Sequence, residues 1–118
     1  MKINPKTKKI IENNPVAFAT ISGNKPHVIG VAYCKVLGKD TILITDNFMK
    51  STVKNILKNN NVALVAWNKK WEGVQILGKV KYYREGKWLD YVKKMKENRG
   101  MPAKGAILIK VGKVIKSK

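Results

Sequence analysis

Residues 41–57 read TILITDNFMKSTVKNIL, and their pattern changes half-way along the segment. The first five, Thr41–Thr45, are almost all β-branched, which favours a strand. Apolar residues then recur at spacings of three and four, which places them on one face of a helix: Val53, Ile56 and Leu57. The segment therefore predicts a strand that leads almost directly into a helix beginning at Lys50.

The start of this helix is a candidate anion site. A helix start presents unpaired backbone N–H groups and the positive end of the helix dipole. Ser51 and Thr52 add two hydroxyls, and Lys50 and Lys54 add two ammonium groups within about one turn. Such a group of donors suits a phosphate. The alternative is that Ser51 only caps the helix while both lysines face water.

Outside this segment the chain alternates between strands, turns and short helices. Asn4 followed by Pro5 predicts a first helix, which Pro15 keeps from continuing. Strands are expected at residues 16–21, 27–37, 41–45, 62–67, 74–83 and 106–111, and further helices at 50–60 and 88–95. The strand 74–83 is expected to bend at Gly78, and a basic tail is expected after Val111.

This order of elements predicts the fold class. Consecutive antiparallel strands with helices inserted between pairs favour a mainly β, α+β fold, in which a six-stranded antiparallel sheet closes partly into a barrel. Every loop is too short for a linker, so residues 1–118 are expected to form a single domain.

The charge of the chain points to an anionic partner. The sequence has 25 basic and 7 acidic residues and a formal net charge of +18, a field that concentrates phosphates, nucleic acids or acidic surfaces. However, 23 of the basic residues are lysines spread along the chain, whereas readout of base edges favours arginine. The positive charge therefore has two interpretations, a solvated lysine-rich surface and a surface that binds nucleic acid.

The scarcity of cysteine and histidine excludes several classes of protein. Cys34 is the single cysteine and His27 the single histidine, so an internal disulfide is excluded and a transition-metal site lacks its ligands. Cys34 is expected to pack in the core, and His27, directly after Pro26, to be a surface or capping residue. Because no disulfide framework is possible, we expect a protein of the reducing cytoplasm. We also expect that it does not enter membranes, because the sequence has no apolar stretch long enough to span one.

Five segments along the chain carry a family resemblance through their order and spacing. They are residues 15–20 (PVAFAT), 25–28 (KPHV), 44–56, 60–64 (NNVAL) and 74–80 (VQILGKV). Together they resemble the FMN-binding split β-barrel family, which includes the pyridoxamine 5'-phosphate oxidases and the small bacterial FMN-binding proteins. The resemblance implies a homodimeric split barrel with FMN at the interface between the two copies.

The resemblance also implies which residues bind the cofactor. The FMN phosphate is expected at Lys50, Ser51 and Thr52, the helix start that the local pattern already favours. The isoalloxazine ring is expected along the second and third strands, where it lies beside Val28, Ile29, Gly30 and Val31. Thr45 and Asp46 are expected near the edge of the ring, and Gln75, on a later strand, is expected to contact the flavin. Trp67, Trp71 or the loop around Met101 would cover the ring from the partner, unless these residues serve ordinary packing.

The implied function is that of an FMN-binding flavoprotein, either an oxidoreductase related to the pyridoxamine 5'-phosphate oxidases or an electron-transfer protein. The chain lacks the long C-terminal portion that carries their substrate contacts, so oxidation of pyridoxamine phosphate itself is not expected. The alternatives are a split barrel that binds a deazaflavin, a structural role with an empty pocket, and a nucleic-acid-binding barrel. In the last case strand aromatics would stack on bases; these are Tyr33, Trp67, Tyr82 and Tyr83.

Overall fold

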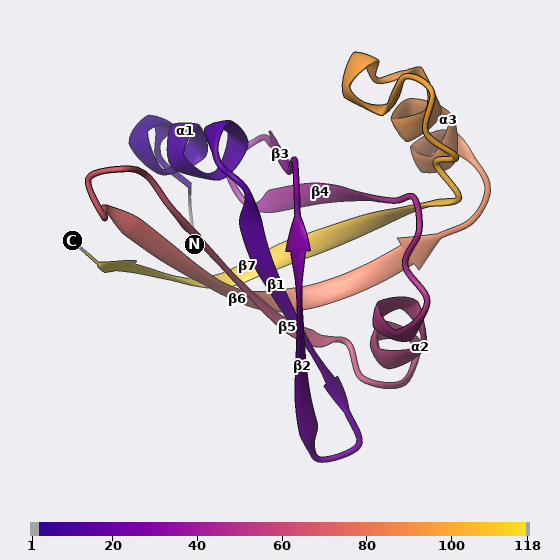
Figure 1. The fold of residues 1–118 in the computed structure, drawn as a ribbon, viewed down its shortest axis with the longest axis horizontal. Coiled ribbons are helices and arrows are strands. Elements are labelled where there is room, and N and C mark those ends of the chain that lie inside the picture. The colour runs from indigo at the N-terminus through magenta and orange to yellow at the C-terminus, as the bar shows by residue number, and fades with distance from the viewer. Residues whose placement is uncertain (1–2, 118) are drawn as a thin grey trace.

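The structure, a computed structural model, describes residues 3–117 and is built around one antiparallel sheet (Figure 1). The strands are β1 Val16–Ser22, β2 Lys25–Val31, β3 Lys35–Leu37, β4 Thr41–Asp46, β5 Asn61–Trp67, β6 Gly73–Tyr83 and β7 Gly105–Ser117. The helices are α1 Pro5–Asn13, α2 Ser51–Lys58, α3 Lys87–Lys94 and a short 3-10 turn, η1, at Lys96–Asn98. The sheet order is β2-β1-β5-β6-β7-β4-β3. The expected mainly β, antiparallel fold with short helices is therefore confirmed.

The number of strands differs from the expected six, because the predicted strand 27–37 is two strands. β2 and β3 stand at opposite edges of the seven-stranded sheet, and residues 32–34 cross between those edges outside any strand. Their apolar composition gives no turn signal, so the break was not predicted. The sheet is barrel-like, but its two edge strands, β2 and β3, are connected by residues 32–34 and do not pair with each other through backbone hydrogen bonds.

The final strand is also longer than expected. β7 continues to Ser117 where a basic tail was predicted, and it pairs with β6 along their whole common length. The register of this pair shifts between Leu77 and Gly78, which leaves Gly112 as the extra residue of a bulge. The bend predicted at Gly78 is confirmed.

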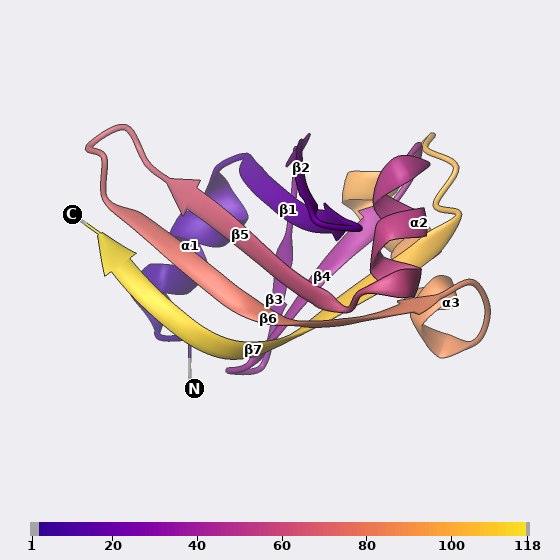
Figure 2. The same cartoon turned by 90° about the horizontal axis from the view of Figure 1, so that it is seen from below.

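The long pair β6–β7 curves along the length of the molecule (Figure 2). Gly78 makes this curvature possible, because a Cβ at that position would meet the carbonyl oxygen of Lys110 and lie 2.9 Å from Ile109 Cγ2. α1 lies toward one end of the pair, and α2 and α3 lie toward the other (Figure 1). The curved sheet thus wraps the core while its ends carry the helices.

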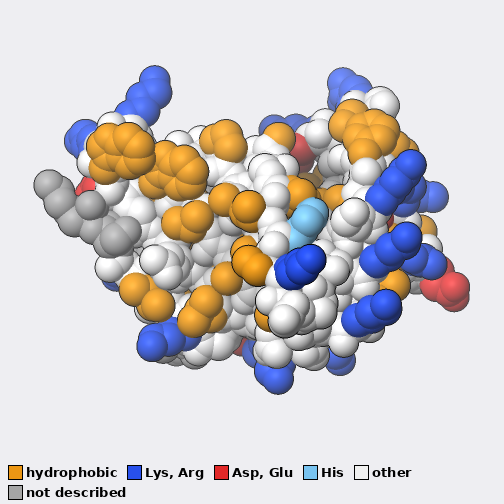
Figure 3. All heavy atoms as spheres, turned by 60° about the horizontal axis from the view of Figure 1, so that its bottom comes forward, with side chains coloured by type: hydrophobic (Ala, Val, Ile, Leu, Met, Phe, Trp, Pro, Cys, Tyr) orange, Lys and Arg blue, Asp and Glu red, His pale blue; other side chains and the backbone are white. Residues whose placement is uncertain are grey.

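Alternation along β1 and β5 separates the core from an outer surface. Phe18 and Leu64 face each other in the ladder and are buried, together with Ile11 of α1. The alternate residues face outward and form what we call the outer apolar face: Ala17, Ala19, Val28, Ala63, Val65 and Leu77. Figure 3 shows apolar side chains gathered on this side of the molecule, with two large aromatic groups at one margin.

The helices fix the ends of the sheet. α3 covers the side of β4 and β7 opposite the main core, where Leu43, Val92 and Ala106 form a second buried cluster. α2 packs against β1, and the Asn55 Nδ2 donates a hydrogen bond of 3.0 Å to Thr20 Oγ1. Among the described residues, no helix has the length and apolar character needed to cross a membrane.

Candidate functional site

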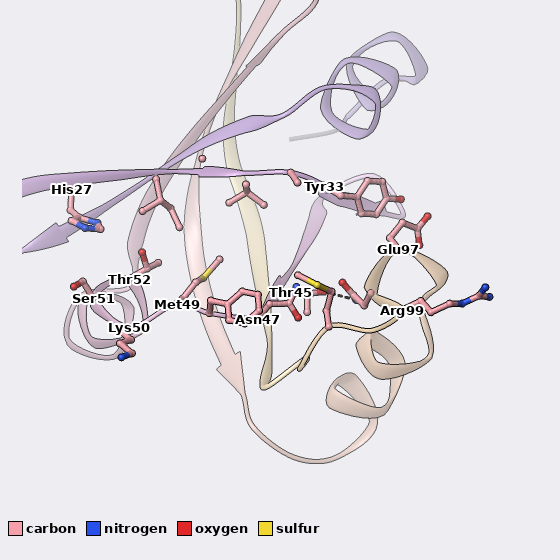
Figure 4. Close-up of a pocket in the computed structure, with 17 residues that line it drawn as sticks. His27, Tyr33, Thr45, Asn47, Met49, Lys50, Ser51, Thr52, Glu97 and Arg99 are labelled. Atoms are coloured by element: carbon pink, nitrogen blue, oxygen red, sulfur yellow. Dashed lines mark hydrogen bonds between the residues drawn. The ribbon is translucent and has the colours of Figure 1, made fainter.

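A pocket of about 690 Å³ lies where the sheet, α2 and the segment before β7 meet (Figure 4). One wall is β2, the floor contains the end of β4, and the start of α2 closes one end. The segment from Glu97 to Met101 closes the other end. This volume lies within the range of about 300–1,000 Å³ that is usual for small-molecule sites.

The start of α2 gives this pocket an anion-binding end. Lys50 stands at the N-cap position, and no side chain caps the helix. Ser51 is exposed, whereas Thr52 is only 2% exposed and lines the pocket. The first hydrogen bond within the helix runs from the Lys54 N–H to the Lys50 carbonyl. The N–H groups of residues 51–53 therefore have no acceptor within the helix. Ser51 is the first residue of the helix and does not cap it, so that part of the alternative is wrong, whereas Lys50 and Lys54 are exposed, as the alternative expected.

Asp46 holds the loop that leads into α2. Its carboxylate accepts a hydrogen bond of 2.9 Å from the Met49 N–H and one of 2.5 Å from the Tyr82 hydroxyl. Asp46 is 2% exposed, and burial together with this bond raises the pKa of Tyr82. Both carboxylate oxygens are thus used inside the protein, so Asp46 positions the loop from behind and leaves the anion-binding end without a carboxylate.

Three hydrogen bonds hold the opposite end of the pocket, two to β4 and one to Asn47, the residue that follows β4. Asn98 Nδ2 donates to Thr45 Oγ1 at 2.8 Å, the contact drawn in Figure 4. The Ala103 N–H donates to Asn47 Oδ1 at 2.8 Å, and the Lys104 N–H donates to the Asp46 carbonyl at 2.8 Å. The segment that forms this wall is therefore fixed relative to the strand end.

Tyr33, Glu97 and Arg99 lie at this fastened end, away from Lys50 and Ser51 (Figure 4). Burial is the main cause of the raised pKa of the Tyr33 phenol, and the negative charge of Glu97 adds to it. The pocket thus has a basic, hydroxyl-rich end and a second end that carries both charges and a phenol.

His27 also lines the pocket, and the sequence reasoning missed it. Its imidazole lies beside Ser51 and Thr52 (Figure 4), and its Nδ1 is buried without a hydrogen-bond partner in the described structure. The signal was present in the sequence. His27 stands two and four residues before Ile29 and Val31, so strand alternation places all three side chains on one face.

Seven of the ten predicted cofactor residues line this pocket. They are Ile29, Gly30, Val31, Thr45, Lys50, Ser51 and Thr52. Asp46 lies behind it, as described above. Val28 and Gln75 lie on the opposite side of the sheet, where they border a shallower hollow on the outer apolar face. Strand alternation explains the case of Val28, because four consecutive residues of a strand cannot all present side chains to one face.

The remaining candidate groups take no part in the pocket. Cys34 is fully buried in the main core, and desolvation raises the pKa of its thiol to about 12. A thiol in this state is not nucleophilic, so the prediction that Cys34 packs is confirmed. Between Ile3 and Ser117, no group of three or more histidine, cysteine, aspartate or glutamate residues is arranged to hold a metal ion.

Comparison with known families decides the affiliation of the chain. The model of the pyridoxamine 5'-phosphate oxidase family matches residues 3–118. The chain belongs to the pyridoxamine 5'-phosphate oxidase family. A relative at the sequence level is the uncharacterized protein MJ0282 of Methanocaldococcus jannaschii, which is 36% identical over 97% of this chain and 80% of its own length.

Solved structures share the fold of this family member at lower sequence identity. HupZ of Group A Streptococcus superposes with a TM-score of 0.88 at 20% identity, over 97% of this chain and 93% of HupZ. An FMN-binding protein of Syntrophomonas wolfei has a TM-score of 0.82 at 18% identity, over 94% and 83% of the two chains. An F420 reductase has a TM-score of 0.72 at 15% identity, over 95% and 98%. These likenesses establish the fold of the pyridoxamine 5'-phosphate oxidase family for the chain.

Proposed function

We propose that the pocket binds FMN non-covalently and that the protein is an FMN-dependent oxidoreductase or electron-transfer protein. The observation that carries the proposal is the construction of the pocket, in which an anion-binding helix start adjoins a strand wall. FMN has a phosphate at one end and a flat ring at the other. Membership of the pyridoxamine 5'-phosphate oxidase family supports the same cofactor.

The phosphate end fits FMN by its donors and its charge. This end of the pocket offers hydrogen-bond donors: two hydroxyls, the Lys50 ammonium and the unpaired N–H groups of α2. Such a set of donors favours an anion with several acceptor oxygens. Asp46, the carboxylate nearest in the chain, is occupied by the Met49 N–H and the Tyr82 hydroxyl. A phosphate at this place therefore meets donors and no competing negative group from Asp46.

The strand wall fits the ring by its shape. Gly30 lines the pocket, and a Cβ built there would have no atom within 4 Å. Its backbone is therefore open to a flat group, with the Ile29 and Val31 side chains on either side. Thr45 accepts a hydrogen bond from Asn98, which leaves its hydroxyl hydrogen available to an acceptor at the ring edge.

In the proposed complex, FMN and the protein would have different roles. FMN, when bound, supplies the hydride or electron chemistry. The chain would hold the phosphate at α2 and place the ring against β2. Tyr33, Glu97 and Arg99 lie at the far end of the pocket, where a redox partner would approach.

The visible spectrum of the purified protein tests the proposal directly. We expect a yellow protein whose ligand, released by heat, is identified as FMN. A colourless protein that also fails to bind added FMN would overturn the proposal. The alternative ligand, a deazaflavin, is distinguished in the same measurement by its spectrum and mass, and the fold neighbour that is an F420 reductase makes this comparison worthwhile.

The role of the helix start is tested by changing Lys50, Ser51 and Thr52 together to alanine. We expect the affinity for FMN to fall about 100-fold, because three donors to a charged group are lost. Affinity for riboflavin, which lacks the phosphate, should change less than about 5-fold on the same reasoning. Both are measured by quenching of flavin fluorescence.

A matched control for this variant is the replacement of Lys69 and Lys70 by alanine. Both lysines are exposed and lie outside the main pocket, so they report the effect of lost charge alone. Equal losses of FMN and riboflavin affinity in the triple variant would refute the phosphate role of the helix start.

We also propose that two copies of the chain associate through the outer apolar face. Trp67 and Trp71 stack with ring centroids 6.4 Å apart beside this face, and Trp71 is 71% exposed. Trp71 has a φ of 64°, a conformation that is costly for a bulky residue. Asn68 maintains it by accepting hydrogen bonds from the N–H groups of Lys70 and Glu72.

Two of the predicted cofactor residues that lie outside the pocket belong to the surface proposed for this association. Val28 and Gln75 border the hollow on the outer apolar face, and Val28 is 63% exposed. In a dimer that pairs these faces, both side chains would lie at the interface between the two copies. Apolar contact over such a face is the usual driving force for association of identical chains.

Leu77→Asp tests this association. Leu77 is 40% exposed on the outer apolar face, so the fold should tolerate a charge that the interface would not. We expect the unaltered protein to sediment at twice the chain mass and Leu77→Asp to sediment as a monomer. Leu57→Asp is the control, because Leu57 is exposed on α2 outside that face. A monomeric unaltered protein would exclude the dimer.

The alternative of a nucleic-acid-binding barrel depended on strand aromatic residues that stack on bases. Its four aromatic residues do not share a surface: Tyr33 lines the pocket, and Trp67 lies beside the outer apolar face. The Tyr82 hydroxyl donates a hydrogen bond to the Asp46 carboxylate, and Tyr83 packs against the second buried cluster. A continuous platform for stacked bases is therefore not formed by these residues.

A further inference from the structure

We propose that the exposed side of α2 docks an acidic electron-transfer protein, which delivers electrons to the FMN of the adjoining pocket. This surface, which we call the α2 basic face, consists of four residues: Lys50, Lys54, Leu57 and Lys58. The inference rests on the proposed function, because it names the electron donor for the same pocket. It adds a protein-binding surface that lies mostly outside that pocket.

Helical spacing brings the residues of the α2 basic face together. They follow one another at intervals of four, three and one residues, which places them on the same side of the helix. The opposite side is buried and carries Thr52, Val53 and Ile56. The three lysines are exposed, and Leu57 between them is 59% exposed. The face thus forms a positive stripe about 12 Å long with an apolar side chain inside it.

Within residues 3–117, no salt bridge reaches the lysines of the α2 basic face. The salt bridges of this part of the chain join Lys6 to Glu72 and Lys110 to Asp40. The sequence has no acidic residue from 47 to 71, whereas α1 and α3 each contain one. Lysines four residues apart repel each other and destabilise a helix. A negatively charged partner would remove this repulsion.

The α2 basic face adjoins the pocket. Lys50 belongs to both, and its side chain lies at the end of the pocket opposite Glu97 and Arg99 (Figure 4). Figure 3 shows lysine and arginine side chains gathered on the side of the molecule that carries α2. A protein docked on this face would lie beside the bound ligand and leave the Glu97 end open to a small redox partner.

The composition of the α2 basic face favours a protein over a nucleic acid. The face has neither arginine nor an aromatic residue, the residue types that read base edges and stack on bases. An apolar residue surrounded by charged ones is typical of a protein interface with a polar rim. Opposite charge raises the rate of association between proteins, and complexes of redox proteins need only a small contact area.

The electron count of the proposed encounter is balanced by a one-electron donor that docks twice. Two reduced donor molecules would each give one electron, and the solvent would give two protons. Oxidised FMN is thereby converted to FMNH2, and both donors leave oxidised. A donor that must dock and leave for each electron requires a weak, rapidly formed complex, which charge complementarity supplies.

Binding can be measured without electron transfer. The 15N-labelled chain loaded with FMN is titrated with an oxidised plant-type ferredoxin, an acidic one-electron carrier, and separately with cytochrome c, a basic one. We expect ferredoxin to shift the backbone amide signals of residues 50–58 at about 0.05 M salt and not at about 0.5 M, because salt screens opposite charges. Cytochrome c should leave them unchanged. Absence of the ferredoxin shifts, or equal shifts with both carriers, would overturn the inference.

Reversal of charge on α2 tests the same surface by affinity and by rate. Lys54→Glu is combined with Lys58→Glu, since both lysines are exposed and lie outside the main pocket. We expect the Kd for ferredoxin to rise at least about 10-fold. With the protein saturated with FMN, reduction by reduced ferredoxin at low salt should also slow about 10-fold in stopped-flow absorbance, and the two rates should converge at high salt.

The matched control places the same charge reversal on α1. Lys8→Glu combined with Lys9→Glu changes the net charge by the same amount, and both lysines are exposed. We expect the Kd for ferredoxin to change less than about 3-fold, because these charges lie outside the contact and are screened. Equal effects of the two double variants would mean that ferredoxin senses only the net charge of the chain, and the docking site on α2 would be refuted.

The outcomes distinguish this inference from the proposed function. If the chain binds FMN but ferredoxin does not shift the α2 signals, the cofactor proposal stands and the docking inference fails. If the chain does not bind FMN, the titration of the ligand-free chain still reports the surface, and α2 shifts would support docking while the cofactor proposal fails. If a single-stranded oligonucleotide shifts the α2 signals and ferredoxin does not, the face binds nucleic acid and the inference is wrong.

Discussion

Replacing Gly78 by alanine is expected to lower the free energy of unfolding by about 2–3 kcal/mol. The added Cβ would press on the carbonyl oxygen of Lys110 and lie 2.9 Å from Ile109 Cγ2. A backbone carbonyl within a ladder has little freedom to move, so β6 and β7 would have to separate where their register shifts. The loss would appear in urea unfolding, and thermal unfolding should begin about 10 °C lower.

Gly30→Ala is the matched control for this prediction. Gly30 is also a strand glycine, but an added Cβ there meets no atom within 4 Å. Its urea midpoint should stay close to that of the unaltered protein, while flavin affinity falls because Gly30 lines the pocket. If Gly78→Ala proved as stable as Gly30→Ala, the curvature of the long strand pair would not depend on a glycine at this place.

Asp46→Ala should cost about 3 kcal/mol of stability and also abolish tight flavin binding. Two donors lose their acceptor in this variant, the Met49 N–H and the Tyr82 hydroxyl. The loop from Asn47 to Lys50 then loses its attachment to the sheet, and with it the fixed start of α2. The first effect is measured by urea unfolding, and the second by flavin fluorescence titration.

Asp40→Ala is the control for Asp46→Ala, because it also removes one negative charge but leaves the loop before α2 attached. Asp40 pairs with Lys110 and Thr41 at the surface, and the hydrogen bond to Lys110 is the main reason that the pKa of Asp40 is lowered. Exposed pairs of this kind contribute little, so its urea midpoint and flavin affinity should remain nearly unchanged. Tyr82→Phe should show part of the Asp46→Ala stability loss. A normal affinity in Asp46→Ala would show that the helix start is held by other contacts.

The parts of the fold that follow from local patterns could be predicted from the sequence. The strand-to-helix segment begins α2 at Ser51, one residue from its expected start, because the change of apolar period is a local property. The bend at Gly78 was likewise visible, since a glycine inside a strand pattern marks a bulge or a close approach. Of the predicted cofactor residues that line the pocket, Lys50, Ser51 and Thr52 followed from the local pattern, and the other four followed from the family resemblance.

The remaining features depend on contacts between distant residues. The predicted strand 27–37 is interrupted because β2 and β3 pair at opposite edges of the sheet. Residues 32–34, where the interruption lies, carry no local turn signal. Asp46 was expected at the ring edge, but its partner Tyr82 lies 36 residues later in the chain and draws the carboxylate behind the pocket. Strand alternation could have placed His27 on the pocket wall, but that its Nδ1 has no hydrogen-bond partner is visible only in the structure.

The position of β7 in the sheet has a consequence for how the protein is made on the ribosome. β7 is the last described strand to be synthesised, yet in the sheet it stands between β6 and β4. Until residues 105–117 have left the exit tunnel, the early strands can form only two separate pieces, β2-β1-β5-β6 and β4-β3. The strand wall belongs to one piece and the strand that precedes α2 to the other. The proposed ligand pocket is therefore completed only after β7 has been made, when every residue that lines the pocket has already been translated.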